Sequence, residues 1–357
     1  MHQGSIPIKI HQAMTQVEQD VAYIKSNFGK GVEQLKVYLE SHKLLIFFLT
    51  PKMGGKSTYI GFLRELFPEK FTVISAGNIV RNIQGLSDSE ALYKLQPIFT
   101  DRTNVVLQEI KSADVKNLVS DDVLYKLLLA EINSGDSSVS PESPPYCPNL
   151  PYSPNYSLIL DGFPRTMVQL DLAFDLIEKL KIQGFVPFVL NIVVSDGVLD
   201  KRMTNRRVCA KCDLVGNMDT LQNTGVDNLK FDFTKNEFFL TCPTCQTPLI
   251  KKTTDTELSE MAERRKVEKD VYAKMVETAQ KSQIPQTTLR TDVLVKYFSG
   301  DDAMLNLSNS YQLDKQGQIT SESVKFTAYS PQGEVYAYHP RWVVGNIVLE
   351  MNLKIRN

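Results

Sequence analysis

Short apolar runs and amphipathic segments alternate along the central part of this 357-residue chain. The runs at 44–49 and 185–194 are almost uninterrupted, as in parallel strands that are buried on both faces. The segments between such runs mix apolar with charged residues, as helices on a sheet do. We therefore expect an α/β fold in which helices flank a parallel sheet. The remaining predicted strands span 71–75, 157–160 and 287–295, and the main predicted helices span 57–66, 166–182 and 257–279.

Three segments depart from this alternation. Residues 1–42 are predicted to form an N-terminal helical extension that packs on the core. Residues 133–157 are dense in Ser and Pro, and because Pro blocks both helices and strand ladders, we expect a disordered or extended surface insertion. Residues 298–357 form a C-terminal extension, in which the alternating stretches 325–329 and 334–338 flank Ser-Pro-Gln-Gly and predict a hairpin.

The charge balance and the hydropathy exclude some classes of protein. The chain has 40 basic and 41 acidic residues, so it lacks the basic excess of a general nucleic-acid binder. No apolar run is long enough to span a bilayer, and the first residues lack the apolar core of a signal peptide. We therefore expect a soluble cytoplasmic protein with neither a nucleic acid nor a membrane as its partner.

A phosphate-binding loop is predicted directly after the first strand. From Gly55 onward, the sequence Gly-Lys-Ser-Thr fits the end of the phosphate-loop pattern and leads into a predicted helix. Small residues let backbone N–H groups turn toward a polyphosphate, while the helix N-terminus and Lys56 add positive charge. The hydroxyl of Ser57 is placed to meet a bound magnesium ion. Thr50 departs from the pattern, which has its first glycine at this position.

An arginine follows each of two further strands. Arg81 lies shortly after the strand at 71–75, and Arg165 lies shortly after Asp161, where the strand at 157–160 ends. A guanidinium group donates two parallel hydrogen bonds to phosphate, and open α/β sheets bind ligands at the carboxyl ends of their strands. Both arginines are therefore predicted phosphate ligands, although each alone also fits a solvated surface residue.

Two Cys-x-x-Cys pairs lie between residues 209 and 245. Such pairs can supply four thiolates to one tetrahedral ion, and zinc is the usual metal. Because the protein would supply all four ligands, the zinc is expected to be structural, and it would stabilise a segment too small to build its own core. The alternative is four reduced, buried thiols. The predicted ligands are Cys209, Cys212, Cys242 and Cys245.

Taken together, these motifs resemble the adenylate kinase family. The string Asp-Gly-Phe-Pro-Arg-Thr at 161–166, with Gln169 after it, is a specific family string. Leu-Val-Ser-Asp-Asp at 118–122 is similar to a segment of the family's monophosphate-binding helices. The order of the phosphate loop, Ser-x-Gly-x-x-x-Arg at 75–81, Arg-x-x-x-Arg and the cysteine lid is also the family's order. The resemblance covers residues 43–295, with insertions.

The resemblance implies a P-loop nucleotide kinase with a core, a monophosphate-binding arm and a zinc-ribbon-like lid. The implied core comprises 43–77, 158–205 and 255–297, the arm comprises 78–157, and the lid comprises 206–254.

The resemblance also implies roles for individual residues. Lys56 would follow the migrating phosphoryl group, and Arg165, Arg206 and Arg264 would converge on it. Gln169 would hydrogen-bond the adenine edge. Magnesium would be held by Ser57 and, through water, by Asp161. The implied ATP-binding residues are Gly54, Gly55, Lys56, Ser57, Thr58, Arg202 and Arg206; the implied AMP-binding residues are Ser75, Arg81, Gly162, Arg165 and Gln169.

At some positions the residue differs from that of the family, and at one position the alignment with the family is ambiguous. Ala76 and Asn78 stand where the family has threonine and aspartate, which weakens the case for AMP over another base. Lys252 stands where the family has an arginine, and the next family arginine falls on Arg264 or on Arg265.

Spacing alone gives Arg202 and Arg206 a shared face if both lie on one helix, where they could also form a solvated cationic surface.

The expected reaction is reversible phosphoryl transfer from ATP to AMP, giving two ADP, with magnesium and a structural zinc ion as cofactors. One alternative is a kinase for another monophosphate, such as UMP or CMP. The other is a non-catalytic nucleotide-binding scaffold on the same fold. We expect a monomer whose terminal extensions are available to a partner.

Overall fold

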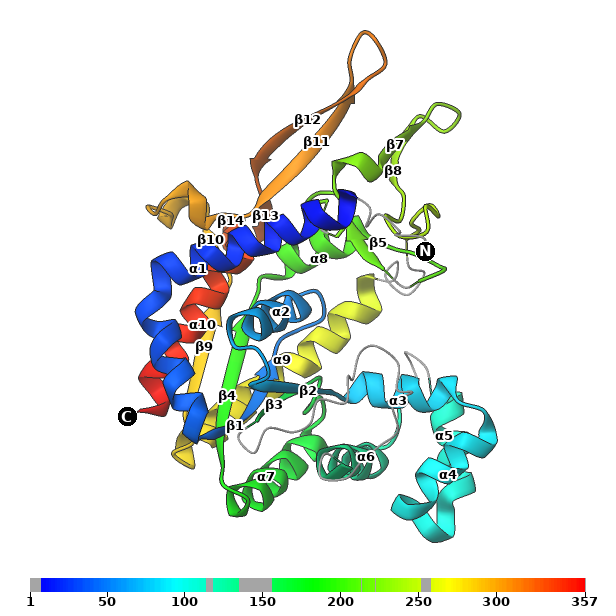
Figure 1. Ribbon diagram of the computed structural model, residues 1–357, viewed down its shortest axis with the longest axis vertical. Coiled ribbons are helices and arrows are strands. Elements are labelled where there is room, and N and C mark those ends of the chain that lie inside the picture. The colour runs from blue at the N-terminus through cyan, green and yellow to red at the C-terminus, as the bar shows by residue number, and fades with distance from the viewer. Residues whose placement is uncertain are drawn as a thin grey trace, which may run out of the picture.

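The computed structural model describes residues 8–113, 118–134, 156–212, 214–221, 223–251 and 258–356. At its centre lies a sheet of five parallel strands in the order β2–β3–β1–β4–β9 (Figure 1). This confirms the predicted parallel sheet. The strands are β1 (Lys43–Leu49), β2 (Phe71–Ser75), β3 (Ser157–Asp161), β4 (Phe185–Val193) and β9 (Gln286–Arg290).

The apolar run that predicted the first strand belongs to the middle strand of this sheet. β1 pairs with β3 on one side and with β4 on the other, and every residue from Leu44 to Leu49 is buried. A strand in this position has helices over both faces, so neither set of its alternating side chains reaches solvent. The uninterrupted apolar sequence follows from that position.

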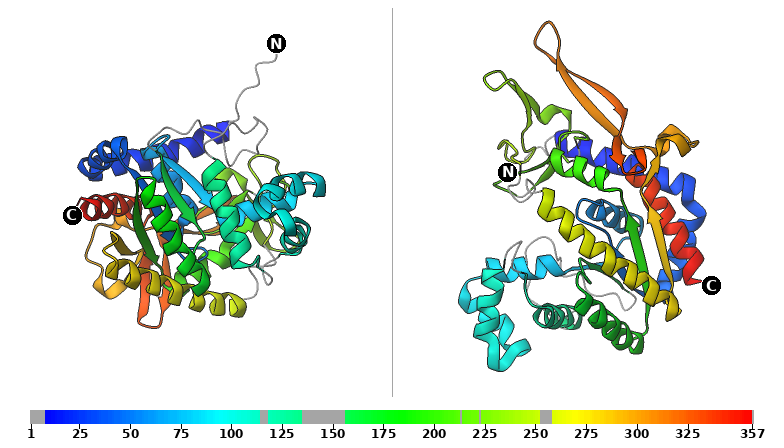
Figure 2. Two further views of the ribbon diagram at one scale, coloured as in Figure 1. Left: turned by 90° about the horizontal axis from the view of Figure 1, so that it is seen from below. Right: turned by 180° about the vertical axis from the view of Figure 1, so that it is seen from behind.

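Helices cover both faces of the sheet (Figure 2). One face is covered by α6 (Asp121–Ser134), α7 (Met167–Ile182) and α9 (Leu258–Lys281). The other is covered by α1 (Ile8–Ser41), α2 (Lys56–Leu66) and α10 (Pro340–Ile355). The two terminal helices α1 and α10 lie side by side, so the N-terminal extension packs on the core together with the C-terminal one.

A helical arm follows β2. It consists of α3 (Ala76–Gly85), α4 (Asp88–Phe99), α5 (Thr103–Ser112) and α6, and it has its own apolar cluster, which includes Leu95, Val106 and Ile110. Most of the Ser/Pro-rich insertion predicted at 133–157 lies outside the described residues. Helix α8 (Asp196–Asn205) leads from β4 toward the cysteine-containing segment.

The cysteine-containing segment forms two small antiparallel ribbons. They are β5 (Arg206–Val208) with β6 (Val215–Asn217), and β7 (Leu229–Asp232) with β8 (Glu237–Leu240). We call residues 206–250 the lid segment. Its small apolar cluster includes Met218, Leu229 and Leu240.

The C-terminal extension contains a second, antiparallel sheet. Strand β14 (Gly333–Ala337) pairs with β13 (Thr327–Ser330), which confirms the hairpin predicted around Ser-Pro-Gln-Gly. On its other side β14 pairs with β10 (Asp292–Leu294). The predicted strand 287–295 is therefore divided: β9 ends in the parallel sheet and β10 belongs to the second one.

A hairpin that the sequence did not predict precedes β13. It consists of β11 (Leu307–Leu313) and β12 (Ile319–Lys325). Within the described part of the chain, none of the helices combines the length and the apolar character that crossing a bilayer requires.

Candidate nucleotide site and cysteine cluster

The predicted phosphate loop joins β1 to α2 at the carboxyl edge of the sheet. Met53 and Gly55 have φ values of 70° and 96°, so the backbone makes a tight left-handed turn before α2 begins at Lys56. Thr50 is buried, and a Cβ built at residue 54 would overlap its Oγ1. The loop therefore accommodates Thr50 at the expected glycine position because Gly54 has no side chain.

Lys56 and Asp161 form an ion pair at this edge. Lys56 Nζ, at the start of α2, contacts the carboxylate of Asp161, the last residue of β3. Because β1 and β3 are paired in parallel, with Phe48 opposite Asp161, the strand ends bring the two side chains together. The loop lysine and the carboxylate predicted to position magnesium thus lie in one place.

The arm arginine Arg81 is exposed at the middle of α3. Its guanidinium group donates a hydrogen bond to the side-chain oxygen of Asn78. Ser75, the residue before α3, is paired with Asp161 across β2 and β3, so the helix begins next to the ion pair. Asn78, which departs from the family pattern, is therefore in contact with the predicted phosphate ligand.

Arg165 and Gln169 lie in a short bonded network. Arg165 Nε donates to the carbonyl oxygen of Gly162 at 2.9 Å, and Arg165 N donates to Gln169 Oε1 at 2.8 Å. Gln169 Nε2 donates to Asp121 Oδ1 at 2.7 Å, and the other oxygen of Asp121 accepts from the Thr166 hydroxyl. Gln169 is only 3% exposed. The amide predicted to bind the adenine edge is thus bonded to protein at both ends.

Tyr272 on α9 lies close to several of the predicted site residues, although the sequence did not predict it as a site residue. Its hydroxyl lies 3.4 Å from the carbonyl oxygen of Thr50 in the phosphate loop. Burial raises the pKa of Tyr272, and the carboxylate of Glu268 raises it further, while Arg165 and Arg264 oppose the rise. The positive charges of both arginines thus lower the pKa of the same phenol. The apolar residues Val271, Tyr272 and Met275 have the spacing of positions on a helix that face the core. This pattern does not indicate a nucleotide site.

Arg264 and Arg265 have different surroundings. Arg264 Nε lies 3.1 Å from the buried carboxylate of Glu268, and its side chain is 27% exposed. Arg265 is 4% exposed, and its Nη1 donates to Asp200 on α8 at 2.6 Å. Arg264 is therefore the one on the Tyr272 side, whereas Arg265 joins α9 to α8. Lys252 lies outside the described residues.

The expectation that Arg202 and Arg206 share a helix face is wrong. Helix α8 ends at Asn205, and Arg206 has the extended dihedral angles φ −67° and ψ 137° as the first residue of β5. Arg202 is helical, and its Nη1 donates to the carbonyl oxygen of Met53 in the phosphate loop at 3.2 Å. The arginine spacing is preserved in sequence, but the chain turns from helix to strand between the two residues.

The four paired cysteines form one cluster, which confirms that the two Cys-x-x-Cys pairs come together. All four sulfur atoms lie within 4.8 Å of one another, and the Sγ atoms of Cys209 and Cys245, like those of Cys212 and Cys242, are 3.4 Å apart. Zinc–sulfur bonds of about 2.3 Å in a tetrahedron place neighbouring sulfurs about 3.8 Å apart. The donor set and its spacing therefore fit a structural zinc ion.

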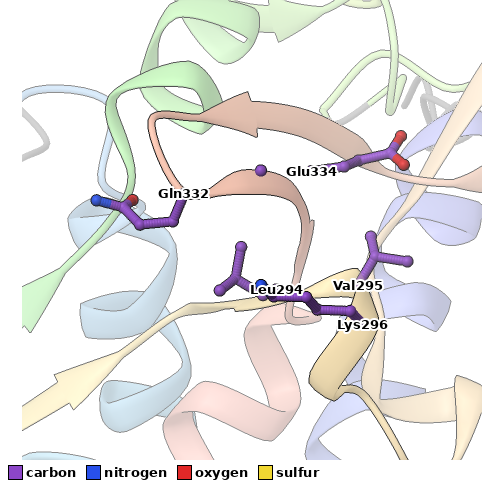
Figure 3. A pocket seen from close by; sticks show the side chains of 6 residues that line it. Leu294, Val295, Lys296, Gln332 and Glu334 are labelled. Atoms are coloured by element: carbon purple, nitrogen blue, oxygen red, sulfur yellow. The ribbon is translucent and has the colours of Figure 1, made fainter.

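A small hollow of about 210 Å³ lies elsewhere, beside β10 and the turn before β14 (Figure 3). It is lined by Leu294, Val295, Lys296, Gln332, Gly333 and Glu334. None of these residues belongs to the predicted nucleotide site.

Curated proteins with similar sequences share one description. The chain is 27% identical to an adenylate kinase of Petrotoga mobilis over 237 residues, which are 66% of this chain and 86% of that enzyme. It is 27% identical to an adenylate kinase of Thermosipho melanesiensis over 49% of this chain and 65% of that enzyme. It is 32% identical to an adenylate kinase of Desulforudis audaxviator over 45% of this chain and 59% of that enzyme.

No protein-family model matches the chain. The chain spans less than two thirds of the Thermosipho and Desulforudis enzymes and most of the Petrotoga enzyme. The parallel sheet with its phosphate loop, the cysteine cluster and these similarities agree with one another. These similarities, at 27–32% identity, support the adenylate kinase family and indicate a phosphotransferase.

Proposed function

We propose that this protein is a nucleoside monophosphate kinase that transfers a phosphoryl group reversibly from ATP to AMP, giving two ADP. One observation carries the proposal. The ion pair between Lys56 and Asp161 lies at the sheet edge where the Tyr272 hydroxyl is 3.4 Å from the carbonyl oxygen of Thr50, and the charges of Asp161, Arg165 and Arg264 each shift the pKa of Tyr272. Cations from the phosphate loop, the segment after β3 and α9 are thus gathered around one position.

Such a gathering suits phosphoryl transfer, which needs little covalent chemistry from the protein. The reaction requires in-line positioning of two nucleotides and neutralisation of the charge on the equatorial oxygens. Lys56 would hold the transferred phosphoryl group, and Arg165 and Arg264 would bind its oxygens as charge develops. In the structure, Lys56 is neutralised by Asp161, an arrangement that a bound polyphosphate would replace.

Magnesium would neutralise charge on the ATP phosphates when it is bound. The Ser57 hydroxyl is exposed at the start of α2, and the Asp161 carboxylate lies next to Lys56, so hard oxygen donors are present where the family pattern expects them. Zinc in the cysteine cluster would stabilise the lid segment without entering the reaction, because all its ligands come from the protein.

The monophosphate would lie between the arm and the segment after β3. Arg81 and Arg165 would bind its phosphate, and the exposed guanidinium group of Arg81 is held by Asn78. Gln169 would meet the base after exchanging at least one of its bonds to Asp121 and Arg165. Because that exchange costs about one hydrogen bond, a different base is a second candidate. The buried Ala76, which lacks a side-chain hydroxyl, supports the same alternative.

The test is a coupled assay of the purified protein with ATP, magnesium and AMP, UMP, CMP or GMP in turn. Diphosphate formation with AMP at a kcat/KM at least tenfold above the other monophosphates would support the proposed reaction. A preference for another base would replace AMP as the acceptor. Turnover with none of them, in protein that still binds ATP, would favour a nucleotide-binding scaffold.

A further inference from the structure

The hairpin β11–β12 lies against the lid segment, although the contacting residues Tyr311 and Met218 are 93 positions apart in sequence (Figure 1). The hydroxyl of Tyr311 donates to the carbonyl oxygen of Met218 at 2.6 Å. The backbone N–H of Asn309 donates to the carbonyl oxygen of Asp219 at 2.7 Å. These two hydrogen bonds join consecutive residues of the lid segment to alternate residues of β11.

Apolar contacts accompany the hydrogen bonds. Tyr311 and Ile319, one from each strand of the hairpin, pack against the apolar cluster of the lid segment. The ring of Tyr311 lies 5.7 Å from the ring of Phe238 on β8. Burial raises the pKa of Tyr311 to about 12, so its hydroxyl keeps the proton that it donates. The contact thus combines directional bonds with a desolvated surface.

The other end of the hairpin is fixed to the core. Strand β12 is followed directly by β13, which packs against α8 so closely that a Cβ at Gly197 would overlap the carbonyl oxygen of Tyr329. Lys201 Nζ on α8 donates to the carbonyl oxygen of Thr327 at 3.1 Å. The chain then passes through β14 to α10, which lies along α1. The hairpin therefore connects the lid segment to the part of the protein that carries both terminal helices.

We propose that the β11–β12 hairpin braces the lid segment in its present position and that Tyr311 is the main positioning residue of the brace. The inference rests on the proposed kinase function. In Figure 1 the hairpin and the ribbon β7–β8 lie at one end of the molecule, and α4 and α5 of the arm lie at the other. A lid that covers both nucleotides must move toward the arm, and this movement strains the contacts with the hairpin.

The brace would change the affinity for ATP by changing the fraction of molecules in which the lid segment is closed. If ATP binds best when the lid segment is closed, contacts that hold the segment open reduce the apparent affinity by the fraction of closed molecules. Weakening the brace then tightens ATP binding and leaves AMP binding at the arm unaffected. A residue that served only the stability of the fold would produce no such tightening.

The experiment compares Tyr311→Phe with the wild type by calorimetric titration of magnesium-ATP in the absence of an acceptor. The substitution keeps the ring and removes the hydroxyl that binds Met218. We expect Kd for magnesium-ATP to fall about threefold to tenfold, the equivalent of one hydrogen bond. In turnover, KM for ATP should fall while KM for AMP stays unchanged. Tyr329→Phe is the matched control, because Tyr329 lies in the same extension and is exposed.

The outcomes separate the brace from the proposed function. If the wild type binds magnesium-ATP and Tyr311→Phe has an unchanged or higher Kd, the brace is wrong and the kinase proposal still stands. A wild type that does not bind magnesium-ATP would overturn the kinase proposal and the brace with it. Should Tyr311→Phe lower the unfolding temperature or the zinc content, Ile319→Thr weakens the same contact from the other strand, and the same fall in Kd is expected.

Discussion

Arg264 and Arg265 are neighbours on α9, yet each is bound to a different acidic residue. Arg264 is paired with Glu268 on its own helix, next to Tyr272 and the phosphate loop. Arg265 is buried against Asp200 on α8. Successive residues of a helix differ by about 100° in direction, so only one of the two can face the nucleotide site. We therefore propose Arg264, which lies on the Tyr272 side of α9, as the site residue.

The first prediction follows from this division of roles. Arg264→Ala should lower kcat at least a hundredfold, because a single arginine on the transferred phosphoryl group can contribute about three to five orders of magnitude. Its unfolding free energy should also fall, because the substitution leaves the buried carboxylate of Glu268 without its partner, so the loss of kcat is what distinguishes it from Arg265→Ala. Arg265→Ala should lower the unfolding free energy by roughly 1.5–3 kcal/mol, through loss of a hydrogen bond between charged groups. Urea titrations and steady-state kinetics of both variants measure the two effects, and the opposite pattern would exchange the roles.

Arg165 provides the second prediction. Arg165→Ala should lower turnover at least a hundredfold, because it removes a cation that acts on the same position as Arg264. Arg64→Ala is the matched control, since Arg64 is exposed on α2 and no site role is proposed for it. A rate for Arg165→Ala within a few fold of the control would remove Arg165 from the catalytic group.

Much of the core could be predicted because each motif follows directly on an apolar strand. The ion pair between Lys56 and Asp161 arises from adjacent parallel strands, so knowledge of the strand ends was sufficient to bring its members close. Arg206 shows the limit of this reasoning. A spacing of four residues says nothing about where a helix ends, and α8 ends one residue before Arg206.

The features that the sequence did not predict depend on contacts between segments that are distant in the chain. The hairpin β11–β12 is largely polar and exposed, so its strands lack the apolar alternation on which strand prediction depends. Its Tyr311 is explained only by the lid segment that covers it. Likewise, the amide of Gln169 is bonded to Asp121, which lies 48 residues earlier, and no local pattern indicates that pairing.

The third prediction concerns this pairing. Asp121→Ala removes the acceptor of Gln169 Nε2 and also the acceptor of the Thr166 hydroxyl, so the Gln169 amide keeps only the hydrogen bond from Arg165 N and is less firmly oriented. We expect KM for the preferred monophosphate to rise about fivefold to tenfold, with a smaller change in KM for ATP. Asp122→Ala is the control, because its exposed carboxylate binds Arg102 on the arm. Equal effects of both variants on the two KM values would show that Asp121 has no special role in base recognition.

The fourth prediction concerns the metal. Protein purified without chelator should contain about one zinc ion per chain, and Cys242→Ser should lose it, because a tetrahedral site with three thiolates binds zinc more weakly. Cys242 is buried in the apolar cluster of the lid segment, so loss of the ion should also lower the unfolding temperature.

Cys147→Ser is the matched control, because Cys147 lies outside both Cys-x-x-Cys pairs and should leave the zinc content unchanged. Elemental analysis together with thermal unfolding distinguishes the alternatives. Four reduced thiols that merely pack together would give no zinc in the wild type and only a small stability loss in Cys242→Ser. Magnesium-ATP binding should weaken along with zinc loss, because the lid segment carries Arg206 at its first strand and needs a folded ribbon to present it.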